Sequence, residues 1–226
     1  MTGVWIALAA IVALLLLAGA VGLGLRKQRE LPAEISNLSD ETSVDAETGA
    51  VRSVQRAEVL IDRAALEQIW TPVHLERLAR TYWRFLTRVT LGLIRVRYSE
   101  RGRAVVLLTE PFRLLTFEPP EYEMDATRGL VRWRIARGVL VARRGRDGAG
   151  HLQIEVRRLP GGDAERARLD VEVGVVNFYP AIASGISLRL YNATQSRIHV
   201  IITYGFLRSL VRLDLAESRV RRFGAS

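Results

Sequence analysis

The chain has 226 residues, a net charge of +9 and no cysteine, so disulfide bonds, thiol catalysis and cysteine-based metal sites are excluded. Nearly all of the basic charge is arginine, with Lys27 as the single lysine, a composition typical of a high-GC bacterium. Beyond the first 25 residues the chain is long enough for one sizeable core or at most two small ones.

The first 25 residues predict a single-pass transmembrane anchor. Val4 to Leu25 is a run of 22 uncharged residues, and a helix of that length, about 33 Å, would cross a hydrocarbon core of about 30 Å. Arg26, Lys27 and Arg29 follow, so the positive-inside rule predicts that the bulk of the chain is cytoplasmic. The alternative is a secretory signal peptide with a cleavage site at Ala18-Gly19-Ala20, but such peptides begin with basic residues.

Residues 26–50 predict an acidic, flexible tether. They hold six acidic and three basic side chains and no aromatic residue, and they are rich in Ser and Thr. Residues 51–226 therefore carry a net charge of +12, which would draw them to an anionic membrane leaflet. The predicted organisation is an anchor at 1–25, a tether at 26–50 and a basic α+β domain at 51–226, located at the cell membrane.

Two helices are expected at the start of this domain. Apolar residues recur at helical spacing between residues 52 and 69. Thr71 and Pro72 then supply an N-cap and a first-turn proline for a second helix over 72–91.

A stripe of arginines with an adjacent tryptophan marks the second predicted helix. It could be a solvated face or a set of partners for sheet carboxylates. It could also be a contact surface for an anionic membrane, or for nucleic acid or an acidic protein. Nucleic acid is not favoured as a partner. The candidate membrane-contact residues are Arg77, Arg80, Trp83, Arg84 and Arg88.

After Gly92 the period of the apolar residues changes from about 3.6 to about 2, which predicts an antiparallel sheet. The outward-facing positions mix arginine with carboxylates, as cross-strand ion pairing requires. About six or seven strands are expected, in segments that begin near residues 94, 104, 112, 122, 131, 152 and 169.

A long C-terminal helix is expected over residues 194–214, although the β-branched residues at 198–203 and Gly205 favour a strand there. The predicted fold class is therefore α+β, with a transmembrane helix, two helices, an antiparallel sheet of about six or seven strands and a C-terminal helix. This order resembles a helix-grip arrangement, in which a curved sheet wraps a long terminal helix.

No pattern in the chain predicts a catalytic, metal or cofactor site. His74, His151 and His199 lack metal-ligand spacing, and no serine lies in a nucleophile-elbow motif. The glycine-rich segment 145–150 lies between two alternating segments, which predicts a hairpin and not a phosphate-binding loop. The sequence therefore favours a non-catalytic protein without a cofactor.

Several aromatic residues would line a ligand cavity between the sheet and the final helix, unless they fill a packed core. They are Trp133, Phe178, Tyr179, Tyr191, Tyr204 and Phe206. The leading hypothesis is a membrane-tethered binding module for a lipid or other apolar ligand, or for an envelope protein partner. The alternatives are an enzyme that acts on a membrane-associated substrate and a structural or assembly protein of the membrane.

Overall fold

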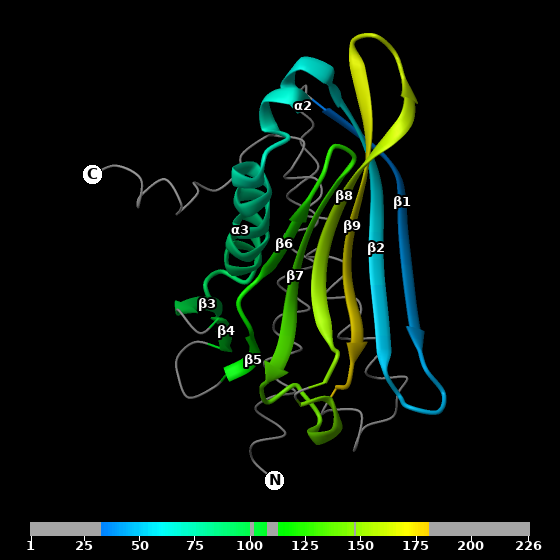
Figure 1. Cartoon of the computed structure of the whole chain (residues 1–226). Helices are drawn as coiled ribbons and strands as arrows, with labels where there is room; N and C mark the ends of the chain where they lie inside the picture. Colours follow the sequence, from blue (N-terminus) through cyan, green and yellow to red (C-terminus); the bar gives the residue numbers. More distant parts are fainter. Residues whose placement is uncertain (1–32, 100–101, 108–112, 147, 181–226) are drawn as a thin grey trace, which may run out of the picture.

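Nine strands dominate the residues that the computed structural model describes, namely 33–99, 102–107, 113–146 and 148–180. They are β1 (Ala33–Val44), β2 (Val51–Asp62), β3 (Ile94–Ser99), β4 (Gly102–Leu107), β5 (Arg113–Phe117), β6 (Glu121–Met124), β7 (Arg128–Arg137), β8 (His151–Gly162) and β9 (Arg166–Phe178). Their order across the sheet is β1-β2-β9-β8-β7-β5-β4-β3, and β6 also pairs with β7 (Figure 1). Every pairing is antiparallel, which confirms the predicted antiparallel sheet.

Two helices, α2 (Arg63–Ile69) and α3 (Pro72–Val89), follow β2 and lie against one face of the sheet, here called the inner face (Figure 1). The second predicted helix is confirmed in α3. Thr71 is its N-cap, with Oγ1 accepting a hydrogen bond from the His74 backbone N–H at 3.3 Å, and Pro72 lies in its first turn. The shorter α2 is capped by Asp62, whose Oδ1 accepts from Ala65 N at 2.7 Å.

The predicted helix over residues 52–69 is wrong up to Asp62, because these residues belong to β2. On the inner face of β2, Ser53 and Gln55 occupy positions where strict alternation would place apolar residues. Val54 and Leu60 on the other face then give the apolar residues of this segment an apparent helical spacing. The burial of those polar residues therefore concealed the strand. The inner-face residues of β2 are Ser53, Gln55, Ala57, Val59 and Ile61.

Residues 33–44 form the edge strand β1, so the expectation of a flexible tether is wrong for these residues. β1 pairs with β2 from Ala33 opposite Ile61 to Val44 opposite Val51, with a bulge between Ser36 and Ser39. Its acidic side chains reach arginines on other strands, as in the 3.3 Å ion pair between Glu41 and Arg52. Charged residues suit an edge strand because they discourage pairing with another chain. The remaining boundaries of the anchor, tether and domain stay predictions.

The predicted fold class is therefore wrong: the described sheet has nine strands, and a hairpin of two of them precedes the helices. The predicted membrane helix at 4–25 and the predicted C-terminal helix at 194–214 lie outside the described residues. Within the part of the chain that the structure describes, no helix has the length and apolar character needed to cross a membrane. Val141 contributes an isolated bridge to Pro180.

Aromatic rings fill the core between α3 and the sheet. The ring of Trp83 lies 5.2 Å from each of the rings of Tyr82, Phe117 and Trp133, measured between centroids. Such edge-on and tilted pairs add to the free energy gained by burying the rings. The burial of Tyr82 also raises the pKa of its phenol, so this side chain stays neutral in the core.

The opposite, outer face of the sheet carries a ladder of arginines and carboxylates. Arg56 Nε donates to Glu172 Oε2 at 2.7 Å, and Arg128 Nε and Arg157 Nε both donate to Glu155 Oε1. The Glu155 side chain is only 4% exposed. Burial acts to raise the pKa of Glu155, but the hydrogen bonds from Arg157 and Arg128 outweigh it and hold the pKa below its usual value. The predicted cross-strand ion pairing is thus confirmed.

Replacing both Arg128 and Arg157 with methionine is expected to lower the free energy of unfolding at pH 7 by about 3 kcal/mol, because Glu155 would stay buried without a cation. In the wild type its stabilising contribution is present above the ordinary glutamate pKa, about 4.3, and is lost as the pH falls through the lower folded value. In the double variant, burial would act alone and raise the pKa of Glu155. The loss in the free energy of unfolding relative to the wild type should therefore shrink as the pH falls toward about 5.

Urea unfolding at the two pH values measures this difference. Arg97→Met, at an exposed position of β3, is the control and should leave both free energies nearly unchanged. An equal deficit of the double variant at both pH values would contradict the role assigned to Glu155.

Candidate ligand-binding cavity

A cavity of about 100 Å³ lies between the two helices and the inner face of the sheet. Its buried floor comes from the strands, and its wall and partly exposed rim come from the helices, the α2–α3 turn and β6. The floor residues are Val59, Ile61, Gly129, Val156, Leu169 and Val171. The wall and rim residues are Leu66, Ile69, Trp70, His74, Leu75, Leu78 and Met124.

Strand register brings the floor residues together from distant parts of the chain. Val59 on β2 lies opposite Leu169 on β9, and Val156 on β8 lies opposite Val171 on β9. Because side chains alternate along each strand, all four point to the inner face. The floor is therefore a direct consequence of alternation in three adjacent strands.

Gly129 on β7 helps to keep the cavity open. It lies opposite Val156, and a Cβ atom placed on it would meet Leu75 Cδ1 of α3 at 3.4 Å, an ordinary van der Waals contact. A small side chain would thus fit at this position, but it would occupy space between the sheet and α3. The absence of a side chain at Gly129 leaves that space to the cavity.

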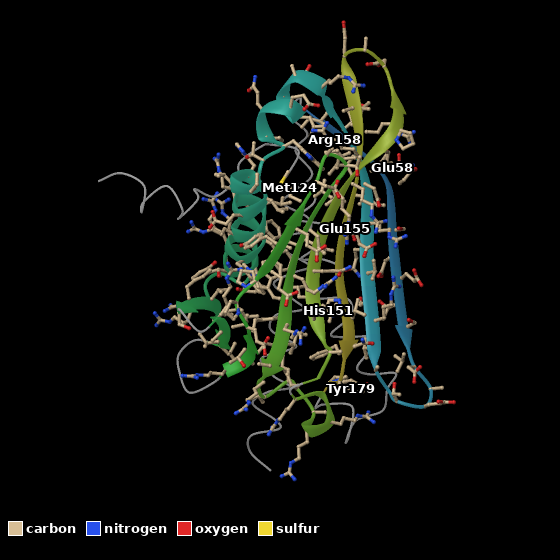
Figure 2. The ribbon with its side chains drawn as sticks, viewed as in Figure 1. Glu58, Met124, His151, Glu155, Arg158 and Tyr179 are labelled. Atoms are coloured by element: carbon tan, nitrogen blue, oxygen red, sulfur yellow. The ribbon has the colours of Figure 1, made fainter. Side chains whose placement is uncertain are left out.

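A clamp of polar contacts fixes Trp70 at the rim. Trp70 Nε1 donates to the Asp125 carbonyl oxygen at 2.9 Å, and the guanidinium of Arg158 lies 4.4 Å from the Trp70 ring centroid. Arg158 Nη1 and Nη2 donate to the two carboxylate oxygens of Glu67 on α2 at 2.7 and 3.2 Å. Hydrogen bonding to Arg158 lowers the pKa of Glu67, so the ion pair persists at neutral pH. Figure 2 shows Arg158 near the α2 end of the sheet and Met124 beside α3.

His74 supplies the one titratable side chain in the cavity lining. Its Nδ1 lies 2.8 Å from Thr71 Oγ1, and its Nε2 lies 3.3 Å from Arg77 Nη1. A guanidinium can only donate, so Nε2 acts as the acceptor and the ring proton lies on Nδ1. Both ring nitrogens are therefore engaged by the helix that carries them.

The predicted pocket residues do not line this cavity where the structure describes them. Trp133 is completely buried against Trp83, and Phe178 is also buried in the core. Tyr179 lies at the opposite end of the sheet from Arg158, with Arg144 5.2 Å from its ring centroid (Figure 2). The other predicted pocket residues, Tyr191, Tyr204 and Phe206, lie outside the described residues.

The predicted membrane-contact residues are divided between the core and the surface. Trp83 is only 2% exposed and belongs to the aromatic core. Arg77 and Arg80 are partly buried, whereas Arg84 and Arg88 are exposed on α3. A membrane contact through these arginines stays a prediction, and Trp83 has no surface from which to take part in it.

Sequence reasoning missed the cavity because it merged α2 with the preceding strand. One signal was present: Asp62 is a favourable N-cap residue directly ahead of a short apolar helix, and it would have set the start of α2. No group of three or more His, Cys, Asp or Glu side chains in the described ranges could hold a metal ion.

No protein-family model matches the chain, and no curated protein shows a significant match. Among solved structures, the chain is similar to the crystal structure of CalU16 from Micromonospora echinospora, with 12% identity and a TM-score of 0.31, over 79% of this chain and 86% of that one. The crystal structure of human STARD10 is 8% identical, with a TM-score of 0.24, over 75% of this chain and 76% of that one. Scores this low show neither a shared fold nor a shared function.

At neutral pH we expect His74 to carry its proton on Nδ1, because Thr71 Oγ1 can accept it while Arg77 can only donate to Nε2. Long-range ¹H–¹⁵N correlation spectra of the imidazole would report the tautomer. Thr71→Ala removes the acceptor and should shift the population toward the Nε2-protonated form. Thr71→Ser, which keeps the hydroxyl, is the matched control, and an Nε2-protonated ring in the wild type would refute the assignment.

Proposed function

We propose that the chain is a non-catalytic module that binds a small apolar ligand, such as one hydrocarbon chain of a lipid, between α2, α3 and the sheet. The observation that carries this proposal is the cavity of about 100 Å³, whose lining is apolar apart from the His74 ring and the indole edge of Trp70. An enclosed cavity of about 150 Å³ lined only by apolar side chains stays dry and binds benzene. The space therefore suits a group of about five carbon atoms.

The composition of the rim supports an adaptable entrance. Met124 is unbranched and polarizable, which lets it follow ligands of different shape. Trp70, in contrast, is held by Asp125 and Arg158 and offers a fixed apolar wall. With Trp70 rigid and Met124 flexible, the entrance selects ligands by their apolar character more than by their exact shape.

The cavity favours binding over catalysis. Its one titratable side chain, His74, has both ring nitrogens in contact with Thr71 and Arg77. A general base must reach a substrate proton directly or through one water, and this ring is already engaged on both sides. The membrane location and the envelope partner rest on no described residue and stay predictions.

The small volume of the cavity limits the binding affinity that the cavity alone can provide. Burying a methylene gains about 0.8 kcal/mol, so about five of them gain roughly 4 kcal/mol, which corresponds to a dissociation constant near 1 mM. A ligand that binds much more tightly must make further contacts outside the cavity.

Gly129→Val is expected to abolish binding of an apolar probe such as benzene, because its side chain would occupy the cavity next to Leu75. Chemical-shift titration of the whole chain gives the affinity, and the thermal midpoint without ligand checks that the variant folds. Gly129→Ala, which meets Leu75 only at an ordinary contact distance, is the milder variant and should weaken binding less.

Ala126→Val provides the control, because it places the same valine side chain at an exposed position of the β6–β7 turn. Benzene binding that survives in a folded Gly129→Val variant would sink the proposal, as would an equal loss in the control.

A further inference from the structure

A second group of side chains on the inner face takes no part in the cavity. It consists of Asp40 and Thr42 on β1 and Ser53 and Gln55 on β2. Gln55 Nε2 donates to Asp40 Oδ1 at 2.8 Å and to Ser53 Oγ at 3.1 Å, and Ser53 Oγ lies 2.9 Å from Thr42 Oγ1. These four residues, here called the Gln55 cluster, form one connected hydrogen-bond network.

The amide oxygen of Gln55 is the anomaly in this network. Gln55 is completely buried, yet its Oε1 accepts no hydrogen bond from any residue that the structure describes. Buried polar atoms of native proteins nearly always have a partner. Turning the amide over would not help, because the oxygen would then face the Asp40 carboxylate and Ser53 would lose its donor. The orientation of the side chain, and hence the unpartnered acceptor, is fixed by its neighbours.

The Gln55 cluster lies close to the cavity on the same face. Gln55 is opposite Val173 on β9, and Val171, two residues along that strand, lines the cavity floor. Two residues of a strand span about 7 Å. Along β2, Ala57 separates Gln55 from the floor residue Val59, so the intervening β2 side chain is a single methyl group.

The cluster also extends toward solvent. Asp40 is exposed on the edge strand and Thr42 is half-buried, whereas Ser53 and Gln55 are buried. The network therefore runs from the edge of the sheet inward. Its unpartnered atom is an acceptor and its one charge is negative, so a carboxylate or phosphate group would be repelled there.

We infer that the Gln55 cluster binds the polar end of the ligand whose apolar part occupies the cavity, and that this polar end is a hydrogen-bond donor, a hydroxyl or an ammonium group. The inference rests on the proposed function and narrows it. A chain of about ten carbons, about five of them in the cavity and about five across the next 7 Å, would reach Gln55 Oε1. The ligand class is then a fatty alcohol or amine, and not a fatty acid.

Matched probes of equal length test this inference in the whole chain. n-Decanol and n-decylamine carry a donor, n-nonyl methyl ether carries only an acceptor, and decanoate carries a negative charge. We expect chemical-shift titrations to show about tenfold tighter binding of a donor probe than of the ether, as one net hydrogen bond gives. Decanoate should bind more weakly than the ether.

Two variants assign the preference to the cluster. Gln55→Leu, in which leucine has a similar volume to glutamine and no acceptor, should bind the donor probe and the ether with equal affinity. Asp40→Asn, at an exposed position, should remove only a preference for decylamine over decanol. This variant therefore distinguishes an ammonium ligand from a hydroxyl ligand.

The outcomes separate the inference from the proposed function. Equal binding of the donor probes and the ether by the wild type would overturn the inference and leave the apolar-ligand proposal intact, as would a donor preference that survives in Gln55→Leu. If neither the ether nor any other probe binds, both proposals fail. Since the comparison of probes on the wild type needs no variant, misfolding of Gln55→Leu would not rescue the inference.

Discussion

The pairing of β2 with β9 is the contact on which the rest of the described structure depends. It joins the first described hairpin to the last described strand, with Val59 opposite Leu169 and Gln55 opposite Val173. A shift of one residue would turn every inner-face side chain of β2 to the outer face. The cavity floor, the Gln55 cluster and the Arg56–Glu172 rung of the outer ladder all follow from this one register.

The cavity and the Gln55 cluster each carry an energetic cost that a merely stable core would avoid. A fully enclosed cavity of about 100 Å³ would cost about 2 kcal/mol, at roughly 24 cal/mol per Å³, and the partly exposed rim lowers this cost. An unpartnered buried acceptor such as Gln55 Oε1 costs about 1–3 kcal/mol more. Together these amount to a large share of the 5–15 kcal/mol by which domains are typically stable. A ligand with an apolar body and a donor at its end would offset both costs at once.

The sequence predicted those elements whose local chemistry is unambiguous. Thr71 and Pro72 set the start of α3, and the alternation after Gly92 predicted the antiparallel strands because one face of each is apolar. Prediction from the sequence failed where tertiary contacts override the local pattern of apolar and polar residues. Buried Ser53 and Gln55 break the alternation of β2, and acidic β1 is ordered through its pairing with β2. The floor of the cavity was unpredictable for a related reason, since it depends on the register between strands more than 100 residues apart.

Methyl NMR of the whole chain tests most directly whether an apolar ligand enters the space between α2, α3 and the sheet. The floor methyls of Val59 and Val171 should shift on titration with benzene. Val54 and Leu130 are equally buried but belong to the outer face, and their methyls should stay unchanged. Shifts confined to the floor would support an apolar-ligand module. Shifts of equal size on both faces, or none at saturating benzene, would contradict it.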